Sequence, residues 1–167
     1  MQLTVRRIRA DEGPALRVVR LAALLDAPSA FGSTHQAEEA QPAQHWTERA
    51  RQGSAGDASA TFFATVDDRI VGLVGAYRPD PNLAVVELVS MWTAPEARRT
   101  GAGRRLVDAV LDWASTASAD SVELWVTQRN DPAIALYRSA GFRETGDQQA
   151  LPSDPRKNEV RMRRPLP

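Results

Sequence analysis

The segment from Arg98 to Gly103 combines glycine and arginine in a pattern that suits anion binding. It follows an apolar run, Val85 to Thr93, that predicts a strand, and it leads into a periodic stretch that predicts a helix over Gly101 to Ala117. A helix that begins just after a strand presents unpaired backbone N–H groups and the positive end of its dipole at one point. Glycine leaves room for a phosphate, and arginine adds charge. We therefore expect a phosphate site at this junction.

Two common glycine motifs do not fit this segment. A nucleoside-triphosphate loop needs Lys and then Ser or Thr after its second glycine, whereas Gly103 is followed by Arg104 and Arg105. A dinucleotide fingerprint needs a third glycine where Leu106 stands. The structural alternative is an ordinary strand-to-helix loop, with glycine for turn geometry and arginine for solubility.

A third motif does fit. Arg98, Gly101 and Gly103 resemble the acetyl-CoA motif of the GNAT superfamily of N-acetyltransferases: Arg or Gln, two residues, Gly, one residue, then Gly or Ala. Met91 to Pro95 resemble the strand end that precedes this motif, with Thr93 where valine is usual. A second block is similar to the family's later helix, although a capped helix that merely packs would show much the same pattern. The block consists of Asn130, Ala133, Leu136, Tyr137, Gly141 and Phe142.

The resemblance implies a fold and a ligand. The fold is α/β (α+β): a mixed, mostly antiparallel sheet of six to seven strands with helices on both faces, in which strands four and five are parallel and splay apart. The ligand is acetyl-CoA, a cosubstrate whose pantetheine arm lies in the splay and pairs with the backbone of Met91 to Thr93, in the manner of an added strand. No metal is implied. The implied cofactor-binding residues are Met91, Trp92, Thr93, Arg98, Arg99, Thr100, Gly101, Ala102, Gly103, Arg104, Asn130, Ala133 and Tyr137.

Two side chains are candidates for the chemistry of direct acetyl transfer. The family usually places a tyrosine at Tyr137, beside the thioester sulfur, where it acts as general acid; the alternative is a tyrosine that only packs. A backbone N–H near Met91 or Trp92 would polarise the thioester carbonyl. Glu87 stands four residues before Met91, so strand alternation predicts that both face the same way, and we expect Glu87 to act as general base through water. The alternative for Glu87 is a solvated or edge glutamate.

The acceptor amine is expected near the region from Ala30 to Arg51 and the final hairpin. An acidic pair there, Glu38 and Glu39, would attract a cationic amine. Trp46 packed under a loop is the alternative to a substrate contact, and His35 and His45 are too far apart in sequence for a helical metal site. The six candidate contacts are Phe31, His35, Glu38, Glu39, His45 and Trp46.

The elements that must position these residues follow from the apolar pattern. The sequence predicts a first strand near Leu3 to Ile8, a helix from Asp11 to Leu25, and a polar helical stretch from Gln36 to Arg51. The later part predicts six more strands and two helices around the two motif blocks. These are strands at Phe62 to Val66, Ile70 to Tyr77, Val85 to Thr93, around Val122 to Val126, Phe142 to Gln148 and Glu159 to Met162, with helices at Gly101 to Ala117 and from Asp131 to Gly141.

Composition limits the remaining classes of function. The 167 residues contain 21 basic and 21 acidic side chains, so no global field favours nucleic acid or a membrane surface. No apolar run approaches a membrane span, and the absence of cysteine fits a reducing compartment, so we expect a cytoplasmic protein. We also expect residues 1–167 to form a single N-acetyltransferase domain. GNAT proteins are often homodimers, but no clear apolar patch in the sequence decides the assembly.

The expected function is transfer of the acetyl group of acetyl-CoA to a primary amine within a ternary complex. A small-molecule amine is slightly favoured over a protein amine. The alternative is a non-catalytic domain that binds acyl-CoA, which would keep Arg98 to Gly103 but need neither Glu87 nor Tyr137. The phosphate-site hypothesis also predicts that a bulky residue at Gly103 abolishes acetyl-CoA binding without unfolding the chain.

Overall fold

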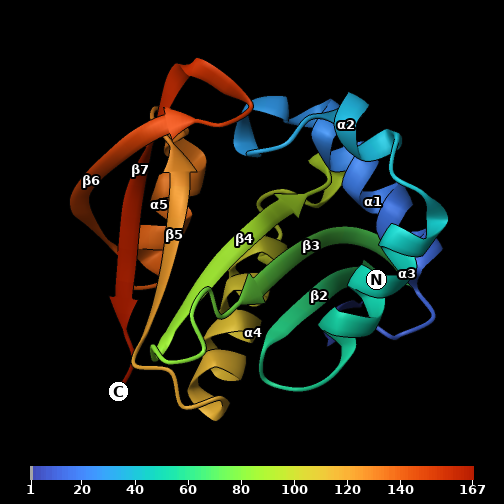
Figure 1. Cartoon of the computed structure of the whole chain (residues 1–167), viewed down its shortest axis with the longest axis horizontal. Helices are drawn as coiled ribbons and strands as arrows, with labels where there is room; N and C mark the ends of the chain where they lie inside the picture. Colours follow the sequence, from blue (N-terminus) through green and yellow to red (C-terminus); the bar gives the residue numbers. More distant parts are fainter. Residues whose placement is uncertain (1) are drawn as a thin grey trace.

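The computed structural model describes residues 2–167, which form one twisted seven-stranded sheet with helices on both faces (Figure 1). The strand order is β1-β2-β3-β4-β5-β7-β6. Only β4 and β5 run parallel, and every other pair is antiparallel. The predicted fold class is therefore confirmed. The strands are β1 Leu3–Arg7, β2 Ser59–Val66, β3 Arg69–Tyr77, β4 Val85–Thr93, β5 Ser121–Thr127, β6 Arg143–Leu151 and β7 Asp154–Pro165.

The helices also follow the predicted order, with one difference. The polar stretch expected as one helix forms two, because Pro42 cannot continue a helix and restricts Gln41 before it. Thr34 caps the first of these helices by accepting a hydrogen bond from the N–H of Ala37 at 3.2 Å. None of the helices in residues 2–167 is both long and apolar enough to cross a membrane. They are α1 Gly13–Asp26, α2 His35–Glu39, α3 Ala43–Ser54, α4 Ala102–Thr116 and α5 Asp131–Ser139, with 3-10 turns η1 Pro28–Ala30 and η2 Pro95–Ala97.

The hairpin of β2 and β3 shows how local chemistry fixes the register of the sheet. Asp67 and Asp68 connect the strands with φ angles of 49° and 66°, so both adopt the left-handed conformation that a two-residue hairpin turn of the I′ type requires. Aspartate tolerates this conformation better than most residues. The two strands predicted at Phe62 to Val66 and Ile70 to Tyr77 are confirmed on either side of this turn.

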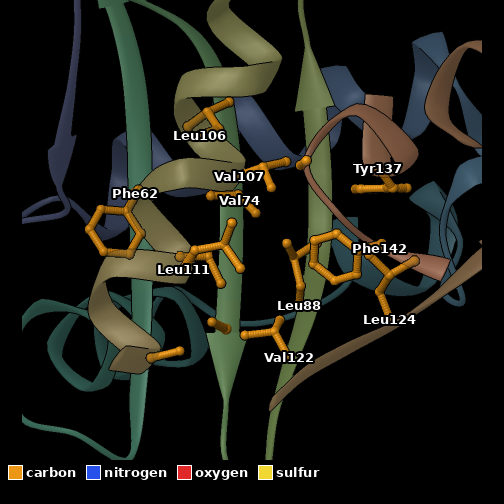
Figure 2. Packing of buried hydrophobic residues seen from close by; sticks show 14 of the residues in the cluster. Phe62, Val74, Leu88, Leu106, Val107, Leu111, Val122, Leu124, Tyr137 and Phe142 are labelled. Carbon is orange, nitrogen blue, oxygen red and sulfur yellow. The ribbon is translucent and has the colours of Figure 1, made fainter. Parts of the chain in front are cut away.

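Two apolar cores lie on opposite faces of the sheet. On one face, α4 buries Leu106, Val107 and Leu111 against the strands, and α5 extends this core (Figure 2). On the other face, α1 and α3 pack Leu16 and Trp46 against the sheet. Trp46 is 1% exposed, so it packs within the core, as the structural alternative predicted. Because helices hold both faces of β3 and β4, the position of β4 is fixed at the centre of the molecule.

Candidate functional site

β4 and β5 separate after three paired residues, as the resemblance implied. Their ladder joins Val85–Glu87 to Ser121–Glu123 and then ends, and beyond it the two strands diverge (Figure 1). A cavity of about 80 Å³ lies between the diverging strands and α5. It brings together residues from both sequence blocks. The predicted cofactor-binding residues that line it are Met91, Asn130, Ala133 and Tyr137.

A β-bulge interrupts β4 at Ser90. Leu73 is paired with Trp92 and Gly75 with Val89, so three steps along β4 oppose two along β3. Ser90 has a φ of 59°, which places it in the left-handed region. A bulge leaves its extra residue outside the ladder, so backbone groups at this point are not used by β3. The bulge therefore adds open backbone polar groups to a wall of the cavity, which Ser90 lines.

The bulge also shifts the alternation of faces along β4, so residues after Ser90 point to the face opposite to the one expected. Val89 lines a space with Leu16 and Arg49 on the α1 and α3 side, as strand alternation from Glu87 predicts. Met91 lies on the other side, with its Cε 3.3 Å from the position that a Cβ would take on Gly103 in α4. The expectation that Glu87 and Met91 share a face is therefore wrong, because one inserted residue shifts the alternation.

The start of α4 has the features expected of an anion site. Its N-cap is Gly101, with a φ of 92°, and no side chain caps the helix. A Cβ on Gly101 would meet nothing within 4 Å, so the space outside this turn is open. The first N–H groups of α4 have no acceptor within the helix. Thr100 directs its hydroxyl to Ala97 O at 2.6 Å and Ala102 is fully buried, so these two positions offer only backbone groups.

Gly103 plays a different part from the one expected. A Cβ at this position would lie 3.2 Å from Leu136 Cδ2 and 3.3 Å from Met91 Cε, so it would press on packed side chains of α5 and β4. A bulky residue at Gly103 would therefore have to displace the ends of the Leu136 and Met91 side chains, and the hypothesis that it abolishes acetyl-CoA binding without unfolding the chain stays a prediction. Glycine here allows α4 to approach α5 and β4 closely.

Two of the three loop arginines are already engaged. Arg98 forms an ion pair with Asp26 and donates from Nε to Thr93 O at 3.2 Å. Arg104 contacts Asp108 at 3.0 Å and Ser139 O at 2.9 Å. Among the described residues, the Arg99 side chain has neither an ion pair nor a hydrogen bond, and its backbone has a φ of 63°. Arg99 is therefore the loop cation that is available to a ligand.

Asp26, which sequence reasoning missed, ties α1 to the end of β4. Besides pairing with Arg98, it accepts a hydrogen bond from Trp92 Nε1 at 2.9 Å. The Trp92 side chain therefore points toward α1 and away from the cavity between the strands. Its backbone remains on β4, which fits the expectation that this position contributes N–H and C=O groups. The only sequence signal for Asp26 was an acidic residue at the predicted end of the first helix.

Tyr137 stands at the wall of the cavity, on α5. It is 5% exposed and packs edge-on against Phe142, with ring centroids 5.8 Å apart (Figure 2). Burial raises the pKa of the Tyr137 phenol well above its usual value of about 10. The phenol is therefore protonated at neutral pH. Asn130 caps the same helix by accepting a hydrogen bond from the Ala133 N–H at 3.4 Å.

Glu87 is held in a buried ion pair, on the side of the sheet opposite to Tyr137. It is 7% exposed, and Arg161 of β7 contacts both of its oxygens, at 2.5 and 2.9 Å. Arg161 also pairs with Glu123 and lies over the Trp125 ring, 5.0 Å from its centroid. Burial raises the pKa of Glu87, and Arg161 partly opposes that rise. The solvated alternative for Glu87 is therefore wrong.

Arg161 belongs to a row of charges that the sequence shows only as alternation along the last strand. Arg161 and Arg163 stand on β7 opposite Trp125 and Glu123 of β5, so successive charged residues share one face. Nearer the start of β7, Glu159 is buried and accepts a hydrogen bond from Gln149 at 2.6 Å. The pairing of β7 with β5 was not evident from the sequence, because the paired residues lie more than thirty positions apart.

Both members of the acidic pair expected to attract the acceptor have partners within the protein. Glu38 is buried and contacts Arg20 at 3.0 Å and Arg49 at 3.1 Å. Glu39 lies 3.7 Å from His35 Nδ1. Phe31 is 3% exposed, within the same core as Trp46. None of the six candidate contacts lines these three cavities, so the cavity walls are formed by other residues.

A larger cavity of about 760 Å³ lies beside the splayed strands. Its walls come from η1, from the turn between β5 and α5, and from the first residues of β7. The β6–β7 hairpin and η1 are neighbours (Figure 1), and Ser153 Oγ donates a hydrogen bond to Phe31 O. Ala30, Thr127 and Asn130 line both cavities, so the two spaces adjoin. Within residues 2–167, no group of three or more His, Asp and Glu side chains is arranged to hold a metal ion.

Known proteins resemble this chain in sequence and in fold. It is 28% identical over 129 residues to the [ribosomal protein bS18]-alanine N-acetyltransferase of Salmonella typhimurium, covering 77% of this chain and 82% of that protein. A GNAT acetyltransferase structure from Streptococcus pneumoniae superposes with a TM-score of 0.79 at 19% identity, covering 99% of this chain and 100% of the other.

A third likeness, to the PaiA N-acetyltransferase of Thermoplasma acidophilum in complex with coenzyme A, has a TM-score of 0.75 at 13% identity, with 99% and 100% coverage. At these identities the two structures bear on the fold alone. The sequence model of the Acetyltransferase (GNAT) family matches residues 21–142, which is most of the chain. The protein therefore belongs to the GNAT family of acetyltransferases.

Proposed function

We propose that this protein is an acetyl-CoA-dependent N-acetyltransferase that moves the acetyl group directly to a primary amine within a ternary complex, and that residues 1–167 act as one domain. The observation that carries the proposal is the cavity between β4 and β5. The bulge at Ser90 and the Tyr137 side chain both line it. The uncapped start of α4 lies close by, because Gly103 packs against Met91 and Leu136 of the same cavity. Anion binding and acyl transfer can therefore take place on one ligand.

The chain's own groups fit the two ends of acetyl-CoA. The free N–H groups of Gly101, Ala102 and Gly103 and the side chain of Arg99 would bind the pyrophosphate. The pantetheine amides would pair with the backbone of Met91 to Thr93. Arg98 and Arg104 support this arrangement indirectly, because they tie the loop to Asp26 and to α5. Acetyl-CoA itself supplies the activated acyl group.

The proton transfers are assigned to opposite faces of the sheet. Backbone N–H groups at the bulge would polarise the thioester carbonyl. Tyr137 would donate a proton to the sulfur as CoA leaves, although its raised pKa means that the proton moves only as negative charge develops there. Glu87 would accept the amine proton through water from the α1 side, where Arg161 holds its carboxylate in one orientation. Arg161 is thus a positioning residue.

A small-molecule amine is the favoured acceptor over a protein amine. A volume of about 760 Å³ falls within the usual range of small-molecule sites, and the cavity adjoins the space assigned to the thioester. The Salmonella relative is named for acetylating alanine of a ribosomal protein, so a peptide N-terminus is the competing acceptor.

Thiol release from acetyl-CoA, measured against a panel of primary amines and short peptides, tests the proposal. We expect release that depends on the amine and a product that is heavier by one acetyl group in mass spectrometry. Acetyl-CoA binding without release for any amine would contradict the proposal and favour a non-catalytic domain that binds acyl-CoA. Faster turnover of peptides than of small amines would reverse the choice of acceptor.

A further inference from the structure

We infer that the acceptor carries an anionic group, such as a carboxylate or a phosphonate, near its reactive amine. The inference rests on the proposed function and names the substrate class of the same site. The observation that carries it is the charge of the larger cavity. Arg129, Arg156 and Lys157 line it, and its only acidic lining residue, Asp26, is already paired with Arg98.

The three cations come from two segments and reach the cavity in different ways. Lys157 Nζ lies 2.5 Å from Ser29 Oγ of η1, so it bridges two walls. Arg156 is exposed and contacts Asp154 at 2.9 Å, outside the cavity lining. The Arg129 side chain has no ion pair among the described residues, and its backbone φ is 70°. Because Asp26 is paired with Arg98, a ligand in this cavity meets an excess of positive charge. The low-dielectric walls of a cleft strengthen the electrostatic potential of such charges.

This cavity is distinct from the proposed pyrophosphate site. None of the residues from Arg98 to Arg104 lines it. It adjoins the space between β4 and β5 through Ala30, Thr127 and Asn130. A molecule that places its amine at the thioester would therefore leave its remaining part in the larger cavity, beside Lys157. Cations at that place suit an anion on the acceptor.

The same arrangement disfavours a polycationic acceptor. Glu38, which would attract one, is occupied by Arg20 and Arg49 and lies outside the cavity. A second ammonium group would face Lys157 without an available carboxylate, and like charges brought together cost binding energy. Selectivity between acceptors would therefore come from repulsion as well as attraction.

Calorimetric titration of the CoA-saturated protein with amines of matched length tests the inference. The probes are 4-aminobutanoate, 4-aminobutanamide and 1,4-diaminobutane, with 3-aminopropylphosphonate as a second anion. We expect an anionic amine to bind about tenfold or more tightly than the amide, and the diamine to bind most weakly. Equal or tighter binding of the amide or the diamine would overturn the inference, as would the failure of both anions to bind.

Variants identify the side chains responsible. Lys157→Gln and Arg129→Asn should each reduce the preference for the anionic amine about fivefold or more, because each removes a cation from the lining. Arg69→Gln, which removes an exposed arginine at the start of β3, should leave the preference unchanged. If the cavity variants instead weaken acetyl-CoA and leave the amine preference intact, these cations serve CoA phosphates and the inference is wrong.

Kinetics separate this inference from the proposed function. Acetylation of the anionic amine at a higher kcat/KM than the amide supports both. An anionic amine that binds with the stated preference while thiol release stays absent for every amine would refute the proposed transfer and leave the anion site standing. Thiol release with an equal or higher kcat/KM for the amide would overturn the inference and leave the proposed transfer intact.

Discussion

The side of the site proposed for acetyl-CoA and the side proposed for the acceptor use different chemical groups. The side proposed for acetyl-CoA offers mainly backbone: the start of α4, the bulge in β4 and the edges of two diverging strands. The other side offers side chains: Lys157 and Arg129 in a cavity, and Glu87 bound to Arg161. Backbone recognition depends on turns and glycines close together in sequence. Side-chain recognition here depends on segments that meet only in the folded protein.

This difference explains how one scaffold could keep a cofactor and change an acceptor. Substitutions along Met91 to Thr93 leave backbone N–H and C=O groups in place, so the proposed pairing tolerates them. A substitution at Lys157 changes the charge of the cavity directly. Four substitutions test this contrast, and the expected change in free energy falls from the first to the last.

Glu38→Gln should cause the largest loss, in folding stability. Glu38 joins Arg20 of α1 to Arg49 of α3 in a buried site, and removing one partner of a buried ion pair typically costs about 3–5 kcal/mol. Chemical denaturation measures the loss. The neighbouring Glu39→Gln is the matched control, because Glu39 is exposed and its substitution should cost less than about 0.5 kcal/mol. Equal losses of stability in the two variants would show that Glu38 does not stabilise the packing of α1 against α3.

Tyr137→Phe should lower kcat on the order of a hundredfold, the lower part of the range for general acid catalysis, and leave acetyl-CoA affinity within about twofold. The ring is retained, so its packing on Phe142 remains. Steady-state kinetics and calorimetry with CoA together make the measurement. A kcat close to that of the wild type would mean that Tyr137 only packs.

Glu87→Gln should lower kcat about tenfold and remove the acidic limb of the pH profile of kcat. Because burial raises the pKa of Glu87, the carboxylate that accepts a proton forms only as the pH rises through that raised value, so kcat should rise over the same range. The pH profile of kcat tests this. The folded state also holds this proton to a higher pH than the unfolded chain, so the contribution of Glu87 to stability should fall as pH rises above about 4.5. An acidic limb that persists in the variant would assign the base elsewhere.

Arg99→Gln should have the smallest effect, an increase of about threefold to fivefold in the KM for acetyl-CoA with kcat unchanged, because an exposed cation is screened by salt. The increase should shrink as salt is raised. The acceptor KM should stay constant, and Arg69→Gln serves again as the control. A change in the acceptor KM alone would place Arg99 at the acceptor side of the site and contradict its proposed contact with acetyl-CoA.

Much of the fold could be predicted because its signals are local. Val85 to Thr93 is β4 as predicted, and the helix expected from Gly101 is α4 within one residue at each end. The family resemblance then supplied the splay of β4 and β5. Pro42 is a local signal too, and reading it would have divided the polar stretch into α2 and α3.

The errors at the site have a common physical cause. The bulge depends on Ser90 adopting a positive φ, a conformation for which serine gives no sequence signal. It reversed the expected relation of Glu87 and Met91. The partner of Glu87 is 74 residues away on β7, and Glu38 is neutralised by arginines on two other helices. Only the tertiary structure shows that Glu87 is bound to Arg161 and that Glu38 is bound to Arg20 and Arg49.

The contact between η1 and the β6–β7 hairpin has a consequence for protein engineering. Lys157 reaches Ser29, Thr127 Oγ1 donates to Ser29 O at 2.5 Å, and Ser153 binds the Phe31 carbonyl. The end of β5 and the β6–β7 hairpin thus both contact Ser29, and the hairpin also contacts Phe31. An exchange of acceptor preference by loop grafting should therefore need η1 and the hairpin from the same donor protein. Either segment grafted alone would lose the hydrogen bonds that join the two.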